Sequence, residues 1–143
     1  MVRTQSAFQS LTESLESAYR RVHRTNGLAR NTRLCAILAF MTARLLLVDD
    51  HTLFRTGLRL IVQDHPSVGS IAEAGSIADA CALQQADTDL VLLDIQLPGM
   101  SGLDGLRLLR QACTKARLVL VSASVVPDAI HEARARGADG FLP

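Results

Sequence analysis

Aromatic side chains are scarce in this sequence: they make up 3% of its 143 residues, with one Tyr and no Trp. The core must therefore be built from Leu, Val, Ile and Ala. Hydrophobic residues account for 48% and charged residues for 20%, which is typical of a globular chain and excludes a disordered one. The length suits one domain that folds alone and leaves no room for a second full domain.

Cysteine is also rare, and the three that occur, Cys35, Cys81 and Cys113, are odd in number and far apart. This spacing excludes a disulfide framework and a zinc site with short ligand spacing, and it favours a reducing, cytoplasmic location. Long apolar runs are absent. The longest, Leu34 to Met41, falls well short of the roughly 18 residues that a membrane span needs.

Neither sign of charge dominates the whole chain, whose net charge is +1. The distribution is uneven, because residues 1–43 carry six Arg and two Glu, whereas residues 44–143 carry nine basic and twelve acidic side chains. The second part is thus mildly acidic, which gives no electrostatic case for nucleic-acid binding by this segment itself.

Residues 1–40 contain no strand-like run and are rich in Ser, Thr and Arg. Apolar residues near heptad spacing, with Ser10 and Glu13 as a possible capping box, predict an amphipathic helix; they are Phe8, Leu11, Leu15, Ala18 and Val22. We interpret 1–40 as a native helical extension or as a translated leader before a true start at Met41, and a targeting peptide is the third reading. Since the predicted helix lacks an obvious partner, we expect the segment to be dispensable for folding.

From Arg44 onward, short apolar runs alternate with helical patterns, as expected for βα units around a parallel sheet. The predicted strands are Arg44 to Val48, Val68 to Ala74, Asp89 to Leu93, Leu118 to Val121 and Gly140 to Leu142. Four helices, recognised by apolar residues at helical spacing, separate them. Ser76 can cap one helix, Pro127 suits a first helical turn, and Gly137 is a C-terminal stop signal.

Three carboxylates follow the predicted strands at the edge where an open parallel sheet binds ligands. Asp49 and Asp50 follow the first strand and Asp94 follows the third. Neighbouring strands lie about 4.8 Å apart, so these side chains would share one pocket. Such a cluster raises a pKa or binds a hard cation, Mg²⁺ in cells. Alternatively, Asp49 and Asp50 are only strand-end and helix-cap residues.

Two further features lie at the same edge. Ser122 ends the fourth strand, where its hydroxyl could donate to an anionic oxygen. The loop from Ile95 to Gly102 contains a Pro and two Gly that allow the backbone to approach the site. Each feature alone is also typical of ordinary turns. The combination of acidic pair, Asp94, this loop and Ser122 is much more specific.

With this combination the sequence resembles the receiver domains of bacterial two-component response regulators from about Arg44 to Pro143. Val48 to His51 and Leu53 to Leu58 are similar to the NarL/FixJ branch. The resemblance implies an α/β, flavodoxin-like (CheY-like), doubly wound sheet of five parallel strands in the order 2-1-3-4-5. It places the receiver at residues 41–143.

The resemblance also implies the roles of individual residues. Asp94 matches the aspartate that takes a phosphoryl group from a histidine of a sensor kinase. Asp49, Asp50, Asp94 and the backbone carbonyl of Gln96 match the Mg²⁺ ligands, and the switch residues are matched by Ser122 and Phe141. Such a domain is a switch and not a turnover enzyme, and it can form a homodimer on phosphorylation.

One departure concerns the C-terminus. Receivers carry a Lys one position beyond the residue that matches Pro143, and Lys115, the only lysine, belongs to the loop before the fourth strand. We therefore expect a truncated receiver without its last helix, whose DNA-binding output domain would follow downstream. The alternatives are a phosphorylation-independent interaction module with a vestigial pocket and a phosphohydrolase, which would need a second carboxylate two residues after Asp94. His51 is given no catalytic role.

Overall fold

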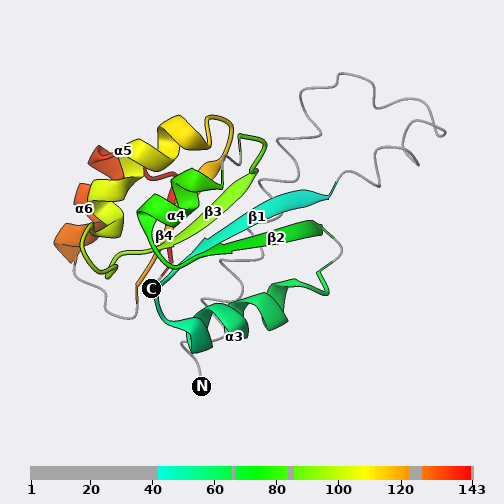
Figure 1. The fold of residues 1–143 in the computed structure, drawn as a ribbon. Helices are drawn as coiled ribbons and strands as arrows, with labels where there is room; N and C mark the ends of the chain where they lie inside the picture. Colours follow the sequence, from blue (N-terminus) through cyan, green and yellow to red (C-terminus); the bar gives the residue numbers. More distant parts are fainter. Residues whose placement is uncertain (1–41, 66, 84–85, 123–126, 143) are drawn as a thin grey trace.

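The structure of this protein is a computed structural model that describes residues 42–65, 67–83, 86–122 and 127–142. Its elements alternate along the chain (Figure 1) in the order β1 (Ala43–Val48), α3 (Thr52–Val62), β2 (Val68–Ala74), α4 (Ile77–Ala82), β3 (Leu90–Asp94), α5 (Gly102–Ala112), β4 (Arg117–Val121), α6 (Pro127–Ala135) and β5 (Gly140–Leu142). The predicted extension at 1–40 and its helix lie outside the described residues.

The five strands form one sheet in the order β2-β1-β3-β4-β5, and every neighbouring pair is parallel. This confirms the predicted fold class and strand order. In the central pair Val48 is level with Leu93, so β1 and β3 end side by side. The residues that follow Val48 and Leu93 therefore emerge at the same edge of the sheet.

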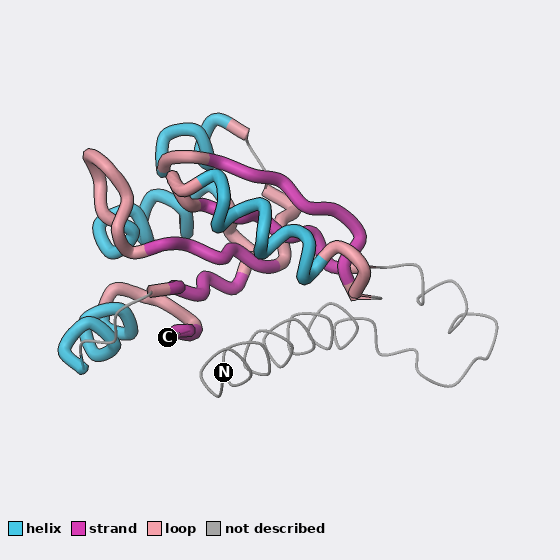
Figure 2. The backbone as a smooth tube through the Cα atoms, turned by 90° about the horizontal axis from the view of Figure 1, so that it is seen from below, coloured by secondary structure: helices cyan, strands magenta, loops and turns pink. Residues whose placement is uncertain are grey.

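Helices lie on both faces of the sheet, as right-handed crossovers require. Helices α4, α5 and α6 cover one face, and α3 lies on the other (Figures 1 and 2). The first face holds the larger core, in which Leu46, Val91 and Leu120 pack against Leu106 and Leu109 of α5. On the second face Val62 of α3 packs with apolar side chains from the strands. Both cores are aliphatic, as the shortage of aromatic residues predicts.

The residues predicted to begin or end helices are found at helix ends in the described part of the chain. The Ser76 hydroxyl accepts a hydrogen bond from the Asp79 amide at the start of α4, and Ser101 caps α5 in the same way. Helix α6 begins at Pro127, and Gly137 follows it with φ of 94°, the left-handed conformation that ends a helix. These local choices agree with the tertiary fold.

Strand boundaries differ from the predictions by one residue. Strand β3 begins at Leu90 and not at Asp89. Asp89 instead forms hydrogen bonds to residues near the starts of β1 and β4. Its amide donates to the Arg44 carbonyl, its carbonyl accepts from the Arg117 amide, and its carboxylate accepts from the Arg44 amide at 2.8 Å. Asp94 consequently becomes the last residue of β3 and is held in the ladder opposite Val121.

The described part of the chain bears on two further expectations, which concern the cysteines and a membrane span. Cys81 and Cys113 are free thiols, and Cys35 lies outside the described residues. Among the described helices, none has the length and apolar character that crossing a membrane requires.

Candidate functional site

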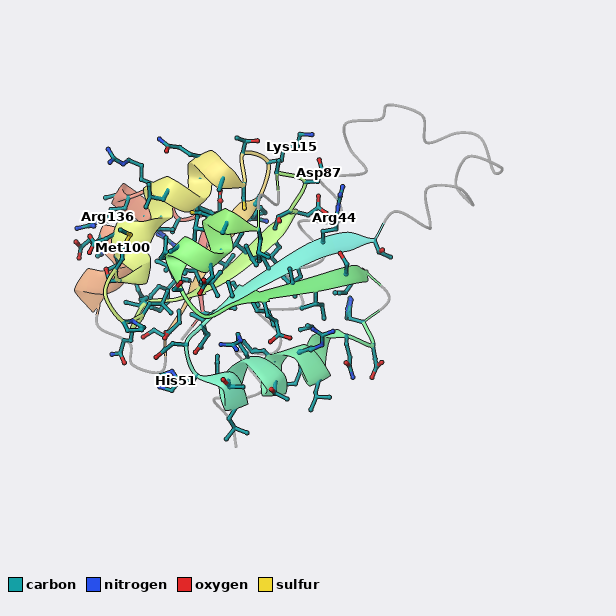
Figure 3. The ribbon with its side chains drawn as sticks, in the orientation of Figure 1. Arg44, His51, Asp87, Met100, Lys115 and Arg136 are labelled. Atoms are coloured by element: carbon teal, nitrogen blue, oxygen red, sulfur yellow. The ribbon has the colours of Figure 1, made fainter. Side chains whose placement is uncertain are left out.

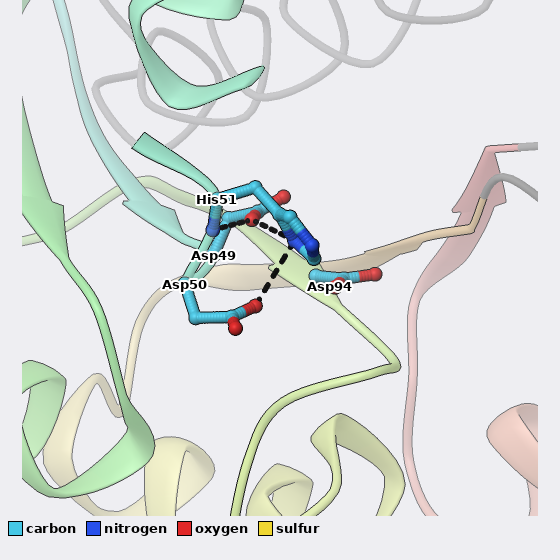
Figure 4. A group of neighbouring side chains, drawn as sticks. All are labelled: Asp49, Asp50, His51 and Asp94. Carbon is cyan, nitrogen blue, oxygen red and sulfur yellow. Dashed lines mark hydrogen bonds and ion pairs between the residues drawn. The ribbon is translucent and has the colours of Figure 1, made fainter. Parts of the chain in front are cut away.

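The predicted carboxylates meet at the carboxyl-terminal edge of the sheet. Asp49 follows β1, Asp50 is the next residue, and Asp94 ends the adjacent strand β3. Ligand atoms of these three residues and of His51 all lie within 4.8 Å of one another (Figure 4). The structure thus brings together the three acidic residues that the sequence analysis grouped, and it adds His51 to them.

Asp49 is the most enclosed member, with 5% of its surface exposed. Its carboxylate accepts a hydrogen bond from the His51 amide at 2.6 Å, which shapes the turn from β1 into α3. The Arg55 guanidinium donates to the Asp49 backbone carbonyl. These two bonds hold the end of β1 and orient the Asp49 carboxylate toward Asp94.

His51 occupies the position before the first turn of α3, but its side chain caps no helical amide. Its ring Nδ1 lies 3.1 Å from Asp50 Oδ1 and 3.3 Å from Asp49 Oδ1, and 69% of the side chain is exposed. Figure 4 shows the ring directed toward both carboxylates. The alternative that Asp50 is the helix cap is wrong, because His51 takes that position.

Asp94 has a pKa above the usual value for an aspartate. Partial burial is the main cause, and the negative charges of Asp49 and Asp50 raise the pKa further, against hydrogen bonds from the amides of Gln96 and Ile95. Among the described residues, no Lys or Arg forms an ion pair with these three carboxylates. The cluster therefore has an unneutralised negative charge, which a cation would stabilise.

The loop after Asp94 folds back tightly onto the strand end. A Cβ at Gly102 would lie 2.1 Å from the Asp94 carbonyl oxygen, so only glycine fits there. Gly99 has φ of 81°, which also favours glycine. The Gly102 amide donates to the Ile95 carbonyl at 3.0 Å. The predicted close approach of the backbone to the site is therefore present at Gly102, whereas Gly99 is required by its turn conformation.

Ser122 directly follows β4 at the same edge, and it is 5% exposed. Its amide donates to the Leu142 carbonyl at 3.0 Å, which ties it to β5. Phe141 lies in β5 and packs on the core beneath α4, α5 and α6. Ser122 thus lies at the same edge of the sheet as the acidic residues, Phe141 lies in the edge strand β5, and Gln96 lies in the loop beside Asp94.

Lys115 lies at the opposite end of the sheet. Its Nζ is 3.9 Å from Asp87, and Figure 3 shows Lys115, Asp87 and Arg44 together, far from His51. Its place between α5 and β4 agrees with the interpretation that this lysine cannot serve the acidic pocket.

The sequence analysis missed the role of Arg55. Besides contacting the Asp49 carbonyl, its Nε donates to Glu73 of β2 at 3.2 Å, and Arg59 donates to the same carboxylate at 2.7 Å. The hydrogen bond from Arg59 is the first cause of the lowered pKa of Glu73, and Arg55 adds to it. No sequence signal beyond the helical spacing of Arg55 and Arg59 could have indicated this link.

The sequence profile of the response regulator receiver domain matches residues 45–143. The chain belongs to the response regulator receiver family. This receiver is 38% identical over 101 residues to the nitrate/nitrite response regulator NarL of Escherichia coli K12, covering 70% of this chain and 47% of that protein.

NarP from the same organism is 37% identical over 100 residues, covering 69% of this chain and 46% of NarP. Among solved structures, the receiver domain of the NarL response regulator from Mycobacterium tuberculosis is similar with a TM-score of 0.64 and 35% identity, covering 71% of this chain and 82% of that one. The chain spans about half the length of the curated relatives that it matches. The resemblance to NarL-type receivers is therefore confirmed for the receiver region.

Proposed function

We propose that this receiver accepts a phosphoryl group on Asp94 from a phosphohistidine of a sensor kinase. The observation that carries the proposal is the position of Asp94, which ends β3 within reach of Asp49 and Asp50 in a chain of the receiver family. Partial burial and its acidic neighbours give this carboxyl group a raised pKa. Perturbed carboxyl groups of this kind are typical of functional sites.

The chemical step follows from the atoms present. An Asp94 carboxylate oxygen attacks the phosphorus, the phosphorus–nitrogen bond to the kinase histidine breaks, and the histidine nitrogen leaves with its electron pair and takes a proton. The product is an acyl phosphate on Asp94. The Arg55 bond to the Asp49 carbonyl keeps the acidic strand end in place, and positioning contributes most of the catalysis in phosphoryl transfer.

The donor set fits a hard divalent cation. Oxygens of Asp49, Asp50 and Asp94 converge within 4.8 Å, and all-oxygen sites that leave room for water suit Mg²⁺. We assign these carboxylates and the Gln96 carbonyl as the residues that would hold it. When bound, Mg²⁺ would neutralise charge on the phosphoryl oxygens.

Ser122 and Phe141 are assigned the switch roles: the hydroxyl would bond a phosphoryl oxygen, and the aromatic ring would change position afterwards. The chain is then a signalling switch in the cytoplasm, and not a turnover enzyme. Its partners would be a sensor histidine kinase, a second copy on phosphorylation, and DNA only through an output domain outside this chain. Residues 41–143 would form the receiver and 1–40 an extension.

The proposal is tested by incubating the chain with acetyl phosphate and Mg²⁺ and measuring intact mass. One added phosphoryl group is expected, and it should be absent in Asp94→Asn and after chelation of the metal. The matched control, Asp87→Asn, changes an aspartate at the far end of the sheet and should label normally. Label that persists in Asp94→Asn would contradict the assignment.

The same assay is repeated with a longer chain that continues through the reading frame beyond Pro143. Labelling of the longer chain alone would show that residues beyond Pro143 are needed for the reaction. No labelling of either chain, even with a cognate kinase, would favour the alternative of a phosphorylation-independent interaction module.

A further inference from the structure

Helix α3 carries two arginines on the side that faces β2. Arg55 and Arg59 are four residues apart, so they lie on the same side of the helix. Glu73 of β2 is level with Leu47 of β1, which is buried on the α3 face of the sheet, and the two side chains therefore point to the same face. Glu73 accepts from Arg59 at 2.7 Å and from Arg55 at 3.2 Å. Both arginines are thus bonded to one carboxylate.

The position of Arg55 lets it reach the acidic site as well. Its amide donates to the His51 carbonyl at 3.0 Å, so it lies one turn into α3. Helical side chains lean toward the N-terminus of their helix, and the Arg55 guanidinium extends back past the helix start to donate to the Asp49 carbonyl. Arg59 lies a further turn, about 5.4 Å along the helix axis, from the site. The Arg55 side chain is 15% exposed and that of Arg59 is 46% exposed.

The Asp49 carbonyl is the first beyond the end of β1, which is at Val48. A carbonyl at a strand end needs a donor from elsewhere, and the Arg55 guanidinium supplies it. The same carbonyl belongs to the peptide unit that joins Asp49 to Asp50. Because a peptide unit is planar, a bond to its oxygen fixes how the two acidic residues are oriented relative to each other.

Glu73 offsets the charge that Arg55 brings to this end of the sheet. A guanidinium beside a cation site repels the cation. The bonds from Arg59 and Arg55 hold the pKa of Glu73 below its usual value, so this carboxylate is ionised at neutral pH. The Arg55 side chain therefore provides a hydrogen-bond donor while Glu73 compensates its positive charge.

We propose that Arg55 is a positioning residue for the cation site, which acts through the Asp49 carbonyl and is itself held in place by Glu73. The inference rests on the proposed Mg²⁺ site of Asp49, Asp50 and Asp94. Arg55 sets the affinity of that site without contacting the cation. Removing a group that orients metal ligands commonly lowers metal affinity by about 10–100-fold.

Isothermal titration of the full chain with Mg²⁺ tests the proposal in Arg55→Met and in the matched control Arg59→Met. Each variant loses one bond to Glu73 and one positive charge, but only the first loses the bond to Asp49. Arg55→Met should bind Mg²⁺ about tenfold more weakly, and Arg59→Met should bind it nearly as wild type does. Loss of positive charge alone would strengthen binding. Equal or tighter binding in Arg55→Met, or an equal loss in both variants, would therefore overturn the proposal.

The wild-type titration separates this inference from the function on which it rests. No Mg²⁺ binding by wild type would overturn the cation site itself, and this inference with it. Binding by wild type that both variants retain unchanged would overturn only the role of Arg55.

The nitrogen chemical shift of the Asp50 amide gives a second readout, because this amide belongs to the peptide unit that Arg55 bonds. The shift should move in Arg55→Met and stay in place in Arg59→Met. If Arg55→Met fails to fold, Arg55→Lys takes its place, since it keeps the charge and alters the donor geometry. The proposal requires the Asp50 shift and the Mg²⁺ affinity to change together, and a change in one of them alone would overturn it.

Discussion

At the amino-terminal end of the sheet Asp87, Asp89 and Asp139 each have a donor, whereas at the carboxyl-terminal end three aspartates face one another. Asp87 pairs with Arg44 at 3.2 Å and with Lys115 at 3.9 Å, and Asp89 accepts from the Arg44 amide. Asp139 accepts from Arg110. These interactions join strand ends and loops, and they are ordinary structural ion pairs.

The pKa of an aspartate is shifted in opposite directions at the two ends of the sheet. Burial acts to raise the pKa of Asp139, but hydrogen bonds from Arg110 and the Leu118 amide outweigh it, so the pKa is lowered. For Asp94 burial and like charges act together, and the pKa is raised. The same residue type is thus stabilised as an anion at one end and destabilised at the other. An anion destabilised at this edge of the sheet is available to bind a cation and to react.

The largest effect on stability is expected from Asp139→Ala. It removes the carboxylate that accepts from the partly buried Arg110 and from the Leu118 amide, which should lower the free energy of unfolding by about 1–3 kcal/mol. Because the folded pKa of Asp139 is lowered, its contribution is present above the unfolded pKa and is lost as pH falls toward the folded value. Urea unfolding at several pH values measures both effects. An unchanged midpoint at neutral pH, relative to Asp64→Ala in an exposed turn, would contradict this role.

At the acidic end, Asp50→Ala should weaken Mg²⁺ binding about tenfold, equivalent to about 1.4 kcal/mol. One of three converging carboxylates is removed, and the remaining charge attracts the cation less strongly. Isothermal titration measures the affinity, and Asp87→Ala is the matched control at the other end. Equal losses in both variants would show that the effect is general charge and not a site.

Asp94→Asn should raise the free energy of unfolding at neutral pH by up to about 1 kcal/mol, because it removes an anion that Asp49 and Asp50 repel. The raised folded pKa of Asp94 means that the folded chain keeps this proton more tightly than the unfolded chain. Stability therefore falls as pH rises from the unfolded pKa to the folded pKa, and the difference from Asp94→Asn grows over that interval. A variant less stable than wild type at neutral pH would argue against repulsion in the cluster.

The smallest effect is expected from Lys115→Ala. Its contact with Asp87 joins side chains that are 76% and 63% exposed, and exposed pairs contribute about 0.5 kcal/mol or less. Phosphoryl labelling of Asp94 should not change, since Lys115 lies at the other end of the sheet. A clear loss of labelling would contradict the separation of the two ends.

Much of the fold followed from local patterns. All five strands were predicted to within one residue of their observed bounds, and the four helices between them were expected. Both follow because apolar runs, Ser76, Pro127 and Gly137 act within a few residues of the chain. The grouping of Asp49, Asp50 and Asp94 could also be predicted, since the ends of neighbouring parallel strands meet at one edge. The assigned roles of Ser122, Phe141 and the Gln96 carbonyl stay predictions.

Interactions between distant segments could not be predicted in this way. The link from Arg55 to Glu73, the bonds of Arg110 to Asp139, and the ring of His51 between two carboxylates depend on which surfaces the fold brings together. The expectation that residues 1–40 are dispensable was drawn from the lack of an obvious partner in the sequence. It stays a prediction, because those residues lie outside the described part of the chain.

The sequence by itself determined the order of strands and helices, the aliphatic core, and the edge at which the carboxylates gather. These follow from side-chain periodicity and from the covalent order of the chain, which each short segment carries independently of the others. Only the tertiary structure decided which aspartates are neutralised and which are left facing one another. Electrostatic and packing energies depend on distances between residues far apart in the chain, and folding alone sets those distances.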